Sequence, residues 1–443
     1  MPYTRTSEPS NKCSLIYYFV ILAYIIKIFS QDMNLIGNFP KIELHSHLHG
    51  SIRHSTLEEL ITKNSVSKLG GASKSDDIIS LNEFQLSIHD PFTIFSAIHQ
   101  TVRTKVVIER ILEELIQDLI SDNVIYAEIR TTPRALDDLN EEEYLKLVLN
   151  IMNLHNTKSI HKHLLQLRLI ISINRKMTLE VANKVIDMAI GARNQYSSNL
   201  VVGIDFSGDF TIGSFNDFII PFTRAKNEGF AITLHAGEEE RLKDQEMKSI
   251  LFFLLSKEEE EDVKVNVDVV DVVDAVDAQK NKNKKIIFKR IGHALFINDE
   301  EMSLLLEHYQ QFGERDSILI EIPPTSNMWT LNLNHLEEHP TLNRWLQNDY
   351  PISISVDDSG VFNTTLSYEL QLVQNTFNLS TSYMASLMMR PVHHVFDQST
   401  RNMRYLEQKY RDYVYSLPLN IRDKVLHAVE DKFSRNIKVL NKN

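Results

Sequence analysis

Short apolar runs alternate with longer amphipathic stretches along most of this chain, beginning near Phe39. Apolar runs of about four to eight residues are typical of buried strands, and apolar residues that recur every three to four positions are typical of helices. The pattern predicts eight strands, at 41–45, 124–130, 167–173, 201–205, 231–235, 289–292, 318–322 and 352–356. It predicts helices between most of them, including 106–121, 141–154, 179–190, 215–227 and 300–311.

This regular alternation indicates an α/β fold in which helices connect parallel strands. Eight strand–helix repeats predict a (β/α)8 TIM barrel. Helical patterns continue from Thr364 to Leu440 and predict a C-terminal helical extension that packs against the barrel. We therefore expect an N-terminal extension at 1–38, followed by the barrel with its extension at 39–443.

Two segments depart from the repeat. Residues 15–26 form an uninterrupted apolar run, LIYYFVILAYII, which is shorter than the roughly 20 residues that cross a membrane. No small-x-small cleavage site follows it before Gln31, so a signal or anchor, an extra packed helix and an irrelevant extension all remain open. Residues 256–285 combine an acidic run, a Val/Asp repeat and a basic tail, which predicts a low-complexity insertion in a loop.

Composition narrows the classes of function. Apolar residues make up 43% and charged residues 24% of the 443 residues, which is typical of a globular protein. The net charge of −12 argues against sequence-independent binding of nucleic acid. The single cysteine, Cys13, excludes an intrachain disulfide and a metal site built from thiolates. We expect a cytosolic monomer without a membrane partner, although the 15–26 run leaves secretion or anchoring open.

Polar residues gather where the predicted strands end. His45 and His47 close the first strand, and residues i and i+2 of a strand point to the same side. Active sites of barrels are assembled at the carboxyl ends of the strands, and Zn²⁺ accepts imidazole nitrogen and carboxylate oxygen while keeping one position for water. Three histidines and one aspartate would meet that description, with one zinc ion per chain. The residues at strand ends are His45, His47, 131–134, Asn174, 207–209, His235, Glu238, His293, 325–327, Asp357 and Asp358.

An ordered series of motifs gives these residues a family context. PKIELHSHLHGS, GIDFSGD, TLHAGE, RIGHA, TSN and SVDDSGVF follow one another along the chain. From about Phe39 to Leu379 the chain thereby resembles the adenosine/AMP deaminase family of zinc hydrolases. ISVDDSGVFNTTLSYEL and RTTPR are most similar to the adenosine deaminase-like branch, whose members act on N6-methyl-AMP.

The resemblance implies a role for each motif residue. The implied zinc ligands are His45, His47, His235 and Asp357, and bound zinc lowers the pKa of its water to about 7. Glu238 would protonate the purine nitrogen beside C6. His293 and Asp358 would orient the attacking water and shuttle its proton to the departing amine.

Substrate choice depends on a second set of residues. His49 stands where deaminases of the free nucleoside carry Asp, and an imidazole can donate to a phosphate that a carboxylate would repel. Arg134 stands where those enzymes tend to have His, and a guanidinium binds phosphate through two hydrogen bonds. The branch commonly has Asn at position 49 and Asp at position 174, so this chain differs there. The predicted substrate-binding residues are His47, His49, His99, Thr131, Thr132, Pro133, Arg134, Asn174, Gly208 and Asp358.

The leading hypothesis is a zinc-dependent aminohydrolase that converts N6-methyl-AMP into IMP and methylamine. An adenosine deaminase is the alternative within enzymes, and substitution of Arg134 or His99 separates the two because only phosphorylated substrates should respond. A non-catalytic protein that binds a nucleoside or a partner is the alternative outside enzymes. The presence of Glu238 argues against it, since binding alone needs no proton donor.

Overall fold

The computed structural model describes residues 35–69, 91–162, 165–196, 199–240, 243–256, 288–419, 421–423 and 425–426. The chain divides into two compact units, Met1–Phe39 and Pro40–Asn443; the short helix α2 (Leu35–Asn38) belongs to the first, and every other element to the second. The apolar run at 15–26 and nearly all of the 256–285 segment lie outside the described residues. Within those ranges, no helix is both long and apolar enough to cross a membrane.

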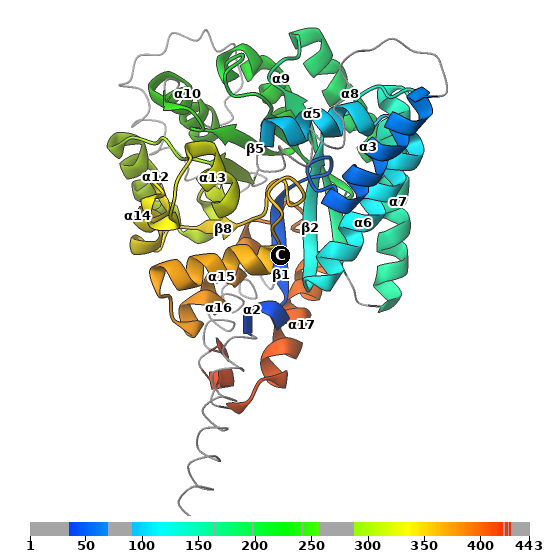
Figure 1. The fold of residues 1–443 in the computed structure, drawn as a ribbon. Helices are drawn as coiled ribbons and strands as arrows, with labels where there is room; N and C mark the ends of the chain where they lie inside the picture. Colours follow the sequence, from blue (N-terminus) through cyan, green and yellow to red (C-terminus); the bar gives the residue numbers. More distant parts are fainter. Residues whose placement is uncertain are drawn as a thin grey trace, which may run out of the picture. The chain divides into compact units, whose positions relative to one another are not determined.

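Eight parallel strands form the sheet of the second unit, and each pairs with the next along the chain. They are β1 (Lys41–His47), β2 (Val124–Thr131), β3 (Gln166–Asn174), β4 (Val201–Ser207), β5 (Ala231–Ala236), β6 (Lys289–His293), β7 (Leu319–Ile322) and β8 (Ile352–Ile354). The chain after β8 returns to β1: Asp357 N donates to His45 O at 2.8 Å, and His47 N donates to Asp357 O at 3.0 Å. This closure confirms the predicted TIM barrel (Figure 1).

Helices surround the strands (Figure 1), and the five predicted ones are confirmed with small changes at their ends. They are α6 (Lys105–Ser121), α7 (Glu141–Lys162), α8 (Leu179–Gln195), α9 (Phe215–Asn227) and α12 (Asp299–Phe312). The others are α3 (His54–Leu69), α5 (Pro91–Thr101), α10 (Lys243–Leu255), α13 (Pro324–Leu331) and α14 (Leu342–Gln347). The spacing of apolar residues explains why these helices were predictable: α6 buries Ile108 and the residues three, four and seven positions after it, Ile111, Leu112 and Leu115.

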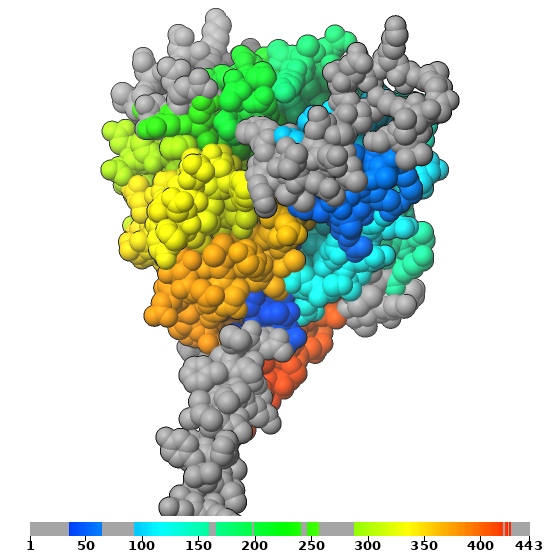
Figure 2. All heavy atoms as spheres, viewed as in Figure 1, coloured from blue at the N-terminus to red at the C-terminus, as the bar shows by residue number. Residues whose placement is uncertain are grey.

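The predicted C-terminal extension is confirmed over its described part. It consists of α15 (Leu366–Phe377), α16 (Thr381–Met389), the 3₁₀ helix η4 (Arg390–His393) and α17 (Thr400–Ser416). α15, in orange, lies against α13, in yellow, in the space-filling view (Figure 2). Between η4 and α17, Phe396 packs in a cluster with Ile170 of β3 and with Val202 and Ala231, which lie at the amino ends of β4 and β5. This part of the extension therefore packs at the barrel end opposite the predicted site, whereas α15 reaches the site end, where its Glu369 accepts from Thr325 N.

Candidate metal centre and active site

His45 and His47 both reach the carboxyl end of the barrel, as their spacing in β1 predicts. Their Nε2 atoms each lie 3.3 Å from Asp357 Oδ1, and His47 Nε2 lies 3.2 Å from His235 Nε2. Zinc ligands about 2.05 Å from a tetrahedral ion stand about 3.3 Å from one another. These distances match the edges of such a tetrahedron, so the four side chains fit one metal ion.

His293 is a further member of this group. A ligand atom from each of His45, His235, His293 and Asp357 lies within 4.8 Å of the others. His293 Nε2 is 4.0 Å from Asp357 Oδ2, farther than the ligand contacts of His47. His293 and Asp357 have positive φ angles of 66° and 61°, a backbone conformation that costs energy outside glycine and gathers at functional sites. Five side chains therefore converge on one point.

Two carboxylates hold the buried imidazoles from behind. His45 Nδ1 donates to Glu321 Oε2 at 2.7 Å, and His235 Nδ1 donates to Asp205 Oδ1 at 3.0 Å. An ionised carboxylate only accepts, so each Nδ1 carries a proton and Nε2 is the nitrogen left for a metal ion. Burial and Arg130 lower the pKa of His45, but Asp357 and Glu321 outweigh them and raise it to about 9, so a metal ion would take the place of a proton on Nε2. His45 Nε2 is buried and has no hydrogen-bond partner among the described residues. A carboxylate behind an imidazole whose free nitrogen faces inward is the usual arrangement around metal-binding histidines, and it fits a metal ion here.

A chain of alternating charges supports the two carboxylates inside the barrel. Its order is Asp205, Arg130, Glu321, Arg290, Glu128, with separations of 3.2, 2.9, 2.6 and 2.6 Å. All five side chains are fully buried. Burial alone would raise the pKa of Asp205 and Glu321, but the cationic neighbours outweigh it and hold both pKa values well below their ordinary range.

Sequence reasoning missed this chain of charges. The signal lay in the strands themselves, because β2 reads VIYAEIRT and β7 reads LIEI. A charged side chain at every second position of an otherwise apolar strand faces one side of the sheet. In a barrel that side is the interior, where a charge is stable only when it is paired.

The predicted catalytic residues Glu238, His293 and Asp358 all stand at this end of the barrel. Glu238 follows β5, and its Oε2 lies 3.6 Å from His293 Nε2. Its Oε1 is buried and meets no hydrogen-bond partner in the described part of the chain. Asp358 is buried against Gly50, where a Cβ atom would stand 1.6 Å from Asp358 Oδ1. Gly50 therefore makes room for the Asp358 carboxyl group.

Part of the predicted substrate-binding set clusters beside β2. The His49 ring stacks on Tyr144 with centroids 5.9 Å apart, and Thr131 Oγ1 lies 2.6 Å from Tyr144 Oη. Burial, followed by the nearby charges of Arg134 and His99, lowers the pKa of His49 well below its ordinary value. His49 Nε2 and Arg134 Nε are buried without hydrogen-bond partners in the ranges described. The structure thus brings two side chains with unused hydrogen-bonding capacity into one neighbourhood.

His99 does not follow a strand: it lies exposed on α5, with its Nδ1 2.7 Å from Phe95 O. The other predicted residues follow strand ends. Thr132 and Pro133 come directly after β2. Asn174 ends β3 and Gly208 follows β4; the φ angle of Gly208 is +111°, and a Cβ there would lie 2.6 Å from Asn174 Nδ2. Asn174 and Gly208 are therefore neighbours, as the predicted parallel sheet requires.

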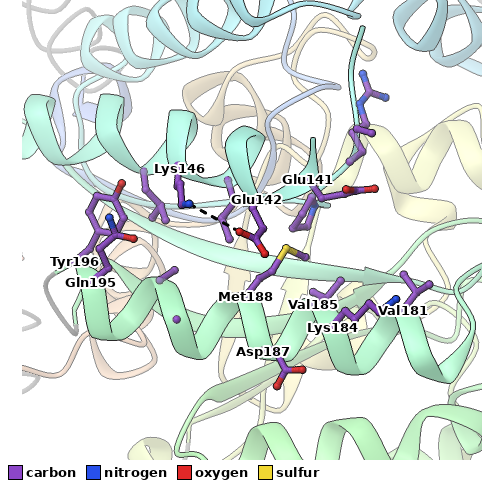
Figure 3. A pocket seen from close by; sticks show the side chains of 17 residues that line it. Glu141, Glu142, Lys146, Val181, Lys184, Val185, Asp187, Met188, Gln195 and Tyr196 are labelled. Atoms are coloured by element: carbon purple, nitrogen blue, oxygen red, sulfur yellow. Dashed lines mark ion pairs between the residues drawn. The ribbon is translucent and has the colours of Figure 1, made fainter. Parts of the chain in front are cut away.

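A separate groove of about 620 Å³ lies outside the barrel between α7 and α8. In Figure 3, side chains of the two helices face one another across it, including Glu142 and Met188, and Glu142 pairs with Lys146 at 3.8 Å. Pro133 and Arg134 stand at its edge. None of the five converging metal-site side chains lines its described walls, so the groove is distinct from the candidate reaction centre.

Comparison with known proteins gives a consistent result. The sequence model of the family "Adenosine deaminase" matches residues 40–246 and 275–410. An adenosine deaminase-like protein of Drosophila melanogaster is 29% identical over 81% of this chain and 91% of its own length. The N6-mAMP deaminase of Arabidopsis thaliana is 28% identical over 84% of this chain and 98% of its own. The crystal structure of Arabidopsis ADAL complexed with IMP superposes with a TM-score of 0.67 at 26% identity, covering 86% of this chain and 99% of that one.

Proposed function

The chain belongs to the adenosine deaminase family, and we propose that it hydrolyses N6-methyl-AMP to IMP and methylamine. The observation that carries this proposal is the pairing of two neighbouring sites. The side chains of the metal site stand beside a buried group of side chains with unused hydrogen-bonding capacity that suits a phosphate. The Arabidopsis relative named N6-mAMP deaminase and the IMP complex of an Arabidopsis structure support the same substrate and product.

We propose zinc as the metal, held by His45, His47, His235 and Asp357. All four ligands are the imidazoles and carboxylate that zinc accepts, and the ligand-atom distances of 3.2 and 3.3 Å suit a tetrahedral ion. When bound, the ion makes a water molecule acidic enough to attack C6 of the purine at neutral pH. Glu321 and Asp205 would keep the Nε2 lone pairs of His45 and His235 directed at it.

The chain's own side chains would move the protons. Glu238 donates a proton from its carboxyl group to the ring nitrogen beside C6, which neutralises the charge that develops there during addition. Its buried Oε1, without a hydrogen-bond partner in the described residues, is the atom available for this contact. Asp358 accepts the proton of the attacking water and passes it to the departing methylamine. His293 holds the water oxygen in place.

His49 and Arg134 distinguish a nucleotide from a nucleoside. Arg134 Nε and His49 Nε2 are buried without a hydrogen-bond partner in the described part of the chain. A phosphate oxygen would accept from Arg134 Nε–H and from the Nε2–H tautomer of His49. A buried polar nitrogen that has no hydrogen-bond partner makes the binding free energy of the complex less favourable. The site would therefore bind a substrate that lacks the phosphate less tightly than a nucleotide. Thr131 and Thr132 would add hydroxyl groups at the same strand end.

The test is a side-by-side assay of N6-methyl-AMP, AMP, N6-methyladenosine and adenosine with metal-loaded protein. We expect the highest kcat/KM for N6-methyl-AMP, and we expect Arg134→Gln to raise KM about tenfold or more for the nucleotides alone. Arg103→Gln is the matched control, since Arg103 is an exposed arginine paired with Asp137. Preference for adenosine, or equal effects of the two variants, would refute the proposed substrate.

The location and assembly of the protein are part of the same proposal. We expect a monomer, because one chain supplies every side chain of the metal site. We also expect the enzyme to be cytosolic, because its proposed substrate is a purine nucleotide and such nucleotides are metabolised in the cytosol. Size-exclusion chromatography with light scattering tests the first expectation, and cell fractionation with an antibody tests the second.

A further inference from the structure

The role of His293 depends on which of its ring nitrogens carries the proton. A neutral imidazole has one N–H, so a lone pair on Nε2 would make His293 a metal ligand, whereas a proton there would make it a hydrogen-bond donor. The position of His293 Nε2 alone does not show whether it carries the proton, because it faces both Glu238 and Asp357, at 3.6 and 4.0 Å. The hydrogen-bond partner of His293 Nδ1 determines which nitrogen is protonated, and that partner is Asn327, at 2.8 Å.

Asn327 is itself oriented by His339, which the sequence motifs did not single out. His339 Nδ1 accepts from the backbone N–H groups of Thr341 and Leu342, at 3.3 and 3.0 Å. Backbone nitrogens only donate, so this Nδ1 carries a lone pair. Burial lowers the pKa of His339 to about 3, which keeps the ring neutral. Its one proton therefore sits on Nε2.

That proton fixes the amide of Asn327. Asn327 Nδ2 stands 2.9 Å from His339 Nε2, and Asn327 Oδ1 stands 2.8 Å from His293 Nδ1. The oxygen and nitrogen of a side-chain amide have nearly the same shape, and their partners decide which is which. Because His339 Nε2 donates, we assign the oxygen to the end beside it, which exchanges Oδ1 and Nδ2 by a half-turn about the Cβ–Cγ bond. The amide nitrogen then donates to His293 Nδ1.

We propose that His339, acting through Asn327, is a positioning residue that holds the proton of His293 on Nε2. His45 and His235 have the reverse arrangement, because their Nδ1 atoms donate to carboxylates and their Nε2 atoms are left to bind the metal. The five converging side chains are thereby divided: His293 donates a hydrogen bond, and the metal is left to His45, His47, His235 and Asp357. The catalytic meaning of this proton, a hydrogen bond to the attacking water, rests on the proposed deamination.

The direct test is the tautomer of His293, read from long-range ¹H–¹⁵N correlation spectra of histidine-labelled protein, both metal-free and zinc-loaded. The His293 signals are assigned by their disappearance in His293→Gln. We expect the Nε2–H pattern in both states. An Nδ1–H pattern would overturn the proposal. No substrate is used, so this result stands independently of whether the protein turns over N6-methyl-AMP.

Asn327→Asp reverses the arrangement with almost no change in shape. A carboxylate accepts from both His339 Nε2 and His293 Nδ1, so the His293 proton should move to Nδ1. We expect the spectrum to change to the Nδ1–H pattern and kcat to fall by about a hundredfold, with KM kept within about threefold. An unchanged Nε2–H pattern in the folded variant would overturn the proposal.

Substitutions of His339 provide a second route should the aspartate variant not fold. His339→Gln places an amide N–H near the position of Nε2, whereas His339→Met removes the donor at similar volume. We expect His339→Met to lower kcat by about tenfold or more and His339→Gln to recover most of it, with KM unchanged for both. His308→Gln is the control, because His308 is a buried histidine on α12 that contacts Phe312. Equal losses in the Gln and Met variants would overturn the proposal.

Discussion

Replacing Glu321 with Gln tests how the barrel interior supports the metal centre. Glu321 is the middle member of the alternating charge chain, 2.9 Å from Arg130 and 2.6 Å from Arg290. It also accepts the Nδ1 proton of His45 at 2.7 Å. Glutamine keeps the shape and removes the charge. An amide can also present its own N–H to His45, which would drive the His45 proton onto Nε2 and oppose metal binding.

Two magnitudes follow from these contacts. Breaking a buried ion pair costs about 3–5 kcal/mol, and we expect the lower end because Arg130 keeps Asp205 and Arg290 keeps Glu128. Loss of a carboxylate behind a metal-binding histidine lowers metal affinity by about 10- to 100-fold. The variant should therefore lose about 3 kcal/mol of unfolding free energy and one to two orders of magnitude in zinc affinity.

Glu128→Gln is the matched control. Glu128 pairs with Arg290 at 2.6 Å and accepts from the backbone of Phe396 at 2.6 Å, but it contacts no imidazole in the described structure. Urea unfolding of the metal-free proteins measures stability, and competition with a chromophoric chelator measures zinc affinity. Both variants should lose stability, and only Glu321→Gln should lose affinity. Equal affinities of Glu321→Gln and the parent protein would refute the reasoning, as would an equal loss in Glu128→Gln.

Three further substitutions probe other parts of the site. Gly50→Ala places a Cβ atom 1.6 Å from Asp358 Oδ1, so we expect kcat to fall by about a hundredfold with zinc content kept; normal kcat would show that Asp358 needs no such fit. Glu238→Gln should keep zinc, measured by atomic absorption, and lower turnover by about 10²-fold or more, whereas unchanged turnover would exclude proton donation by this residue. Burial raises the pKa of Glu369 from 4.5 to about 7. Between pH 4.5 and about 7 the Glu369 carboxyl group therefore stays protonated in the folded state and is ionised in the unfolded state. The free energy of unfolding falls by about 3 kcal/mol as the pH rises through this range. Glu369→Gln should remove that fall from a series of melting curves between pH 4.5 and 8, and an identical pH dependence in the two proteins would contradict the assignment.

The strands and the metal-site residues could be predicted because they obey local rules. Each predicted strand is an apolar run with a polar end, and parallel strands bring such ends together, which places His45, His235 and Asp357 side by side. Strand ends were less accurate. The last strand was predicted at 352–356 but ends at Ile354, because the chain turns through the positive φ of Asp357 and pairs with Ser46 of β1 instead.

The supporting residues could not be found by the same rules. Arg130, Asp205 and Glu321 belong to three different strands and meet only when the barrel closes. His339 lies in the connection between β7 and β8 and reaches His293 only through Asn327. The role of each of these residues depends on a partner that is distant in the sequence. The apolar and polar periodicity of a single segment carries no information about such a partner.

The most direct test of the account is turnover of N6-methyl-AMP by one preparation before metal removal, after it, and after restoration with one equivalent of Zn²⁺. Mass spectrometry follows IMP and methylamine together. We expect both products to form in equal amounts, chelation to abolish turnover, and one zinc ion per chain to restore it. Absence of turnover by folded protein that holds one zinc ion per chain would contradict it.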